Sequence, residues 1–73
     1  MKLNKQEQTV IVGHLINNVI GLELVKQHID PQKLEKAVAL HNEMNDDMTP
    51  KQCRESLIGV LDKTIDEFLK NEE

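Results

Sequence analysis

The chain has 73 residues, a formal net charge of −4, and only 1% aromatic residues. This length allows one domain, and a single core of that size supplies only about 3–5 kcal/mol, so we expect self-association to add to the stability. The scattered basic residues do not readily supply a face for phosphate backbones, and the shortage of aromatic rings disfavours stacking on nucleobases. We therefore do not expect nucleic acid to be the partner.

The sequence also bears on the compartment. Cys53 is the single cysteine and has no partner for an intramolecular disulfide, which is typical of a reducing environment. Residues 1–8 are mostly polar, and polar or charged side chains interrupt the most apolar stretch, residues 10–25. This pattern predicts neither a signal peptide nor a membrane span. We expect a cytoplasmic protein without membrane association.

The first predicted helix covers approximately residues 5–28, and the sequence leaves open whether it is continuous through Gly21. At about 100° per residue, its apolar side chains form two adjoining stripes, too wide for a helix that faces only one core. We therefore predict that this helix is buried on two sides. The first stripe contains Ile11, Leu15, Leu22, Val25 and Ile29, with Asn18 in its middle, and the second contains Val12, Ile16, Val19 and Ile20.

Two proline-marked signals predict the other helices. Asp30 and Pro31 suit the N-cap and first position of a helix over residues 31–45. Thr49 and Gln52 have capping-box spacing, which predicts a third helix over residues 50–70. In this third helix, the pattern indicates one apolar face and one solvated face. The apolar face contains Leu57, Leu61, Thr64, Ile65 and Phe68, bordered by Cys53, Ile58, Val60 and Leu69, and the solvated face contains Glu55, Asp62, Lys63, Asp66, Glu67 and Lys70.

These elements predict a single all-α domain over residues 1–73. It is a three-helix unit with a long first helix, packed with a second copy as a homodimeric helical bundle. The predicted self-association residues are Ile11, Val12, Gly13, Leu15, Ile16, Asn17, Asn18, Val19, Ile20 and Gly21. Within this set, the small residues at positions 13, 17 and 21 indicate either a close helix crossing between subunits or glycines tolerated in a well-packed helix. The amide at position 18 either pairs with its own copy or is satisfied by water or a neighbouring backbone group.

No recognisable catalytic set is present. The spacing of His14, His28, His41 and Cys53 does not resemble a metal site, so we expect no bound metal or other cofactor. We expect the histidine at position 41 to be half-buried, those at 14 and 28 to be partly solvated, and the cysteine to be a small buried hydrophobe. A glycine-rich phosphate loop and a nucleophile–base pair are also lacking. We expect that the protein is not an enzyme.

Three functions remain. The first is a small helical interaction module that binds itself and another protein, as accessory regulators and inhibitors of bacteria and phages do. The second is a helical oligomer that binds a small anion at a subunit interface near the start of the second helix, with Lys26, His28, Lys33 and Lys36 as positive groups. The third is a helix-turn-helix protein that contacts DNA with Lys51, Gln52, Arg54 and Ser56.

Overall fold

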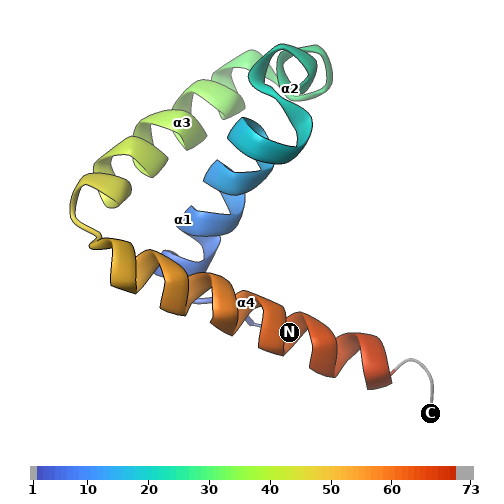
Figure 1. The fold of residues 1–73 in the computed structure, drawn as a ribbon. Helices are drawn as coiled ribbons and strands as arrows, with labels where there is room; N and C mark the ends of the chain where they lie inside the picture. The colour runs from blue at the N-terminus through green and yellow to red at the C-terminus, as the bar shows by residue number, and fades with distance from the viewer. Residues whose placement is uncertain (1, 71–73) are drawn as a thin grey trace.

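The computed structural model describes residues 2–70, and every regular element in this part of the chain is a helix. The elements are α1 (Lys5–His14), the π-helical segment η1 (Leu15–Ile20), α2 (Leu22–His28), α3 (Pro31–Asp46) and α4 (Pro50–Lys70). The predicted all-α class is confirmed. Both α3 and α4 pack against α1, and the C-terminal half of α4 projects beyond it (Figure 1). The homodimeric packing stays a prediction.

The predicted first helix is not continuous over residues 5–28, because the segment is broken at Gly21. Here the backbone has φ 92° and ψ 140°, a conformation that residues with a Cβ rarely adopt. The axes before and after the break differ by 106°, so that α2 turns away from the line of α1 and η1 (Figure 1). No single helix within residues 2–70 is long and apolar enough to cross a membrane, and only the bent pair Lys5–Ile20 and Leu22–His28 reaches that length and composition together.

The predicted helix starts are confirmed by side-chain caps. The Asp30 carboxylate accepts a hydrogen bond of 3.0 Å from the Lys33 amide. Thr49 and Gln52 form the reciprocal capping box, with hydrogen bonds of 2.9 and 3.1 Å. A third cap, on α1, was not predicted, although Asn4 and Glu7 have the spacing of a capping box. These caps begin α3, α4 and α1 close to the residues that the sequence indicates.

The core is small. Among the described residues, the buried apolar side chains are Val10, Val25, Leu34 and Val60, one from each of the four α-helices. None of them is below 2% exposure, and twelve large apolar residues are exposed. The helices therefore leave an unusual share of their apolar surface exposed, and these exposed apolar faces are the candidate interaction surfaces.

Candidate interaction surface

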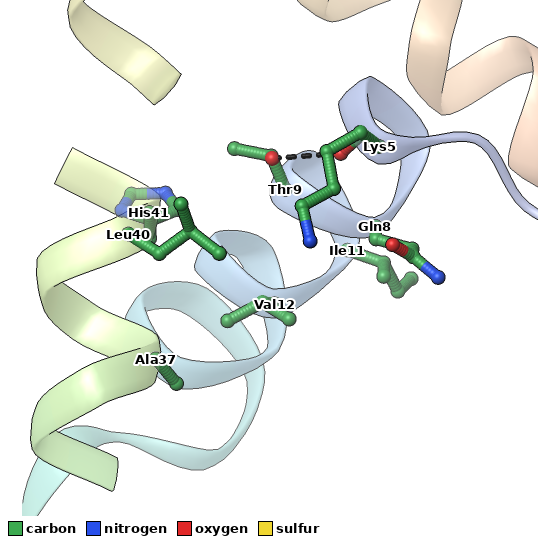
Figure 2. A pocket seen from close by; sticks show the side chains of 8 residues that line it. All are labelled: Lys5, Gln8, Thr9, Ile11, Val12, Ala37, Leu40 and His41. Atoms are coloured by element: carbon green, nitrogen blue, oxygen red, sulfur yellow. Dashed lines mark hydrogen bonds between the residues drawn. The ribbon is translucent and has the colours of Figure 1, made fainter. Parts of the chain in front are cut away.

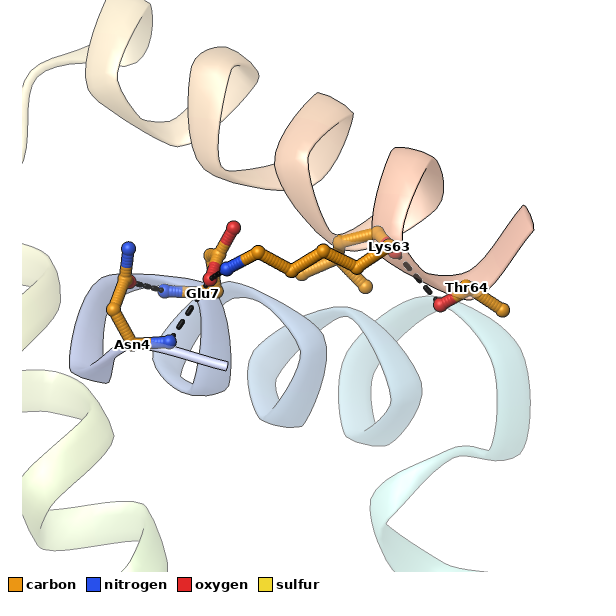
Figure 3. Close-up of polar contacts among 5 residues, drawn as sticks. Asn4, Glu7, Lys63 and Thr64 are labelled. Atoms are coloured by element: carbon orange, nitrogen blue, oxygen red, sulfur yellow. Dashed lines mark hydrogen bonds and ion pairs between the residues drawn. The ribbon is translucent and has the colours of Figure 1, made fainter. Parts of the chain in front are cut away.

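A polar contact joins α1 to α4. Glu7 is only 5% exposed, and its Oε1 accepts hydrogen bonds from the Asn4 backbone amide at 2.9 Å and from Lys63 Nζ at 2.5 Å (Figure 3). The Lys63 hydrogen bond, followed by the Asn4 amide, holds the pKa of the Glu7 carboxyl below its usual value, although burial opposes this shift. One carboxylate thus caps α1 and connects it to α4. The sequence pattern had placed Lys63 on the solvated face of its helix.

Small side chains let α4 approach α1 closely at this contact. Ser56 and Val60 are buried, and a Cβ on Gly59 would overlap Glu7 Oε2. Ser56, Gly59, Val60 and Lys63 therefore form the side of α4 that faces its own chain, which we call the inner side. This side is made of small and polar groups with one buried valine. It contains little of the apolar surface that the helix carries.

The larger apolar side chains of α4 face away from the chain. Ile58, Leu61, Ile65, Phe68 and Leu69, which we call the outer stripe, are 64%, 58%, 43%, 66% and 55% exposed. At about 100° per residue, the outer stripe lies almost opposite the inner side on the helix surface. Four residues predicted for the solvated face are exposed, namely Glu55, Asp62, Asp66 and Lys70. The predicted apolar face is also exposed, apart from the half-buried Leu57, and it is the small, mainly polar inner side that packs on α1.

The residues predicted for self-association are divided between the interior and the surface. Gly13 is buried, and a Cβ there would overlap the His41 imidazole of α3, so the close approach at this glycine lies within the chain. Ile11, Val12, Ile16 and Gly21 are half-buried, while Leu15, Asn17, Asn18, Val19 and Ile20 are exposed. The structure places Asn18 Nδ2 3.2 Å from His14 Nδ1. The exposed apolar part of this set, Leu15, Val19 and Ile20, forms a second candidate surface on η1.

Two clefts lie along α3. The first, of about 360 Å³ between α1 and α3, is lined by Ile11, Val12, Ala37, Leu40 and His41 together with Lys5, Gln8 and Thr9 (Figure 2). The second, of about 410 Å³ between α2 and α3, is lined by Leu22, Lys26, Pro31, Leu34, Glu35 and Val38. Both linings are mainly apolar, which suits aliphatic side chains of a protein partner better than a small charged ligand.

The structure does not gather the four groups proposed for anion binding. Only Lys26 lines the cleft between α2 and α3, where Glu35 also lies, and its ammonium group is 3.9 Å from Glu23. His28, Lys33 and Lys36 are exposed. The Asp30 carboxylate already accepts a hydrogen bond at the N-terminus of α3, the position that an anion would take.

Most of the residues proposed for DNA contact also interact with other groups of the chain or face its interior. Gln52 completes the α4 cap, Lys51 is 4.0 Å from Glu55, and Ser56 is buried towards α1. Of these four, Arg54 alone is exposed without such a contact among the interactions described here. Moreover, α3 and α4 pack on α1 rather than on each other, unlike the two helices of a helix-turn-helix.

The remaining candidate residues are the three histidines and the cysteine. His14 and His28 are exposed, and His41 and Cys53 are half-buried. Within residues 2–70, no three His, Cys, Asp or Glu side chains are arranged to hold a metal ion, and each buried side-chain nitrogen or oxygen has a hydrogen-bond partner.

Compared with known proteins, the chain matches no family model, no curated protein and no solved structure.

Proposed function

We propose that this protein is a small non-enzymatic helical module that works by binding protein surfaces, including a second copy of itself. The observation that supports this function best is the outward-facing apolar side of α4. An amphipathic helix ordinarily buries that side against its own chain. Here the inner side holds α4 on α1 through Glu7, Lys63 and the small residues, so the outer stripe is left for another molecule.

The energies are of the right order for binding. The five residues of the outer stripe expose on the order of 600 Å² of surface, and its complete burial contributes at most roughly 15 kcal/mol at about 25 cal/mol per Å². Association costs about 4–15 kcal/mol in lost translational and rotational freedom. A face of this size therefore supports a specific but modest interaction. A module of this kind acts as an accessory regulator or inhibitor when it occupies the surface of its partner.

Photo-crosslinking in cells tests this function. A photoreactive phenylalanine analogue replaces Phe68 in the outer stripe, and in separate strains it replaces Val19 on η1 or Gln32 on α3. Val19 is 61% exposed and apolar, and Gln32 is an exposed polar control. We expect discrete protein adducts from position 68 or 19 that are lacking at position 32. Equal labelling at all three positions would remove the basis for an interaction module.

A further inference from the structure

The outer stripe has the spacing of a coiled-coil seam. Ile58, Leu61, Ile65 and Phe68 follow one another at intervals of three, four and three residues, and Leu69 borders them. This is the a/d spacing of a heptad repeat over two heptads. Such a seam is suited to another helix with the same spacing. The stripe also contains the chain's single aromatic residue, which is 66% exposed.

The area of the stripe matches what a dimer needs. Specific interfaces bury about 800 Å² on each partner, and the largest apolar patch on a typical monomer measures about 300–600 Å². The stripe supplies on the order of 600 Å², and the polar side chains beside it supply the rim. Only four apolar side chains are buried among residues 2–70, so association with a second copy would add stability to a small core.

The charges along α4 indicate which orientation fits. Two basic residues, Lys51 and Arg54, lie in line with the stripe at its N-terminal end, where Lys51 Nζ is also 4.0 Å from Glu55 Oε1. Asp62 and Asp66 lie beside the middle and the C-terminal half of the stripe. Two parallel copies would place Arg54 beside Arg54, whereas two antiparallel copies about the middle of the stripe keep these like charges apart. The charges therefore favour antiparallel copies about a two-fold axis.

We propose that a second copy of this chain docks on the outer stripe, with the two α4 helices antiparallel about a two-fold axis near the middle of the stripe. This inference rests on the proposed function and names both the partner and the surface. It differs from the arrangement predicted from the sequence, in which the first helix forms the dimer. Two antiparallel helices also place opposite helix-dipole ends together.

Sedimentation velocity over a concentration series tests the surface. Leu61→Glu places a charge in the middle of the stripe, and Val19→Glu is its matched control, because these residues are 58% and 61% exposed. We expect the unchanged protein to sediment as a dimer and Leu61→Glu to weaken dimerisation by about 100-fold, since each dimer carries the substitution twice. We expect Val19→Glu to leave the dimer intact. Helical circular dichroism shows whether each variant is folded.

Disulfide trapping tests the orientation without disturbing the centre of the stripe. In a Cys53→Ser background, Arg54→Cys and Leu69→Cys variants are mixed in equal amounts and equilibrated in a glutathione redox buffer. Antiparallel packing favours the mixed 54–69 disulfide, whereas parallel packing favours the two symmetric disulfides. Mass spectrometry identifies the products. Mainly symmetric products would overturn the antiparallel arrangement.

The failures of the two proposals are distinguishable. A dimer that survives Leu61→Glu and dissociates in Val19→Glu overturns the inference, because η1 would then hold the copies together. An unchanged protein that stays monomeric up to millimolar concentration also overturns it. In either case, adducts with other proteins from position 68 or 19 in the cellular experiment would leave the proposed function standing. Equal labelling at positions 68, 19 and 32, together with an unchanged protein that stays monomeric, would contradict both the proposed function and this inference.

Discussion

The bend at Gly21 makes a specific prediction for backbone substitution. A Cβ at this position would meet no heavy atom within 4 Å, so replacing Gly21 by alanine creates no clash. The cost is confined to the backbone, because φ 92° and ψ 140° lie where residues with a Cβ are strained by about 1–3 kcal/mol. We expect Gly21→Ala to lower the free energy of unfolding by that amount. Its melting temperature should fall by about 4–8 °C for each kcal/mol lost.

The measurement is urea unfolding followed by circular dichroism at one fixed protein concentration, because dimerisation would otherwise shift the midpoint. Alanine favours a continuous helix over glycine by about 1 kcal/mol. If Gly21→Ala raised the stability, residues 5–28 would form the straight helix and the bend would be refuted.

Three further predictions concern the α1–α4 contact and one cap. Gly59→Ala should destabilise the native protein, because its Cβ displaces the Glu7 carboxylate. In a Glu7→Ala background the same substitution should stabilise the protein by up to about 1 kcal/mol through helix propensity. Urea midpoints of the unchanged protein, the two single variants and the double variant give this double-mutant cycle. Because the pKa of Glu7 is lowered in the folded state, the stability that its charge contributes is present above the ordinary value of 4.5 and is lost as pH falls below it. The difference in unfolding free energy between the unchanged protein and Glu7→Gln should therefore shrink on acidification, and a constant difference down to pH 3 would contradict the assigned contact. Thr49→Ala should cost about 0.5–2 kcal/mol by removing the α4 cap, and Thr49→Ser should restore most of it in the same thermal-melt assay.

The sequence predicted well the features that depend on neighbouring residues. The starts at Pro31 and Pro50 follow from local chemistry, because a capping side chain and a proline need only a few residues around them. The sequence leaves open whether the first helix breaks at Gly21, because glycine is also tolerated inside helices. Its conformation here depends on whether α2 is more stable turned away from η1 than in line with it. That choice is tertiary and leaves no local pattern.

The candidate surface likewise has one feature that the sequence predicts and one that depends on the tertiary fold. The apolar spacing on α4 was recognised from the sequence, because periodicity identifies a stripe along a helix. Periodicity does not say whether the stripe faces its own chain or another molecule. In this fold the question is settled by the pairing of Glu7 with Lys63, which lie 56 positions apart and become neighbours only after folding.

The contact between α1 and α4 explains how one helix can serve two interfaces. Close packing on α1 requires small side chains at the crossing, and Ser56 and Gly59 meet that requirement while Lys63 supplies a directional link to Glu7. Such a contact uses a narrow strip of the helix and needs few large apolar groups. The wide, apolar remainder of α4 is then free to contact a second surface of similar shape. In our proposal, the polar crossing sets the position of α4 within the chain, and the outer stripe provides the association energy between chains.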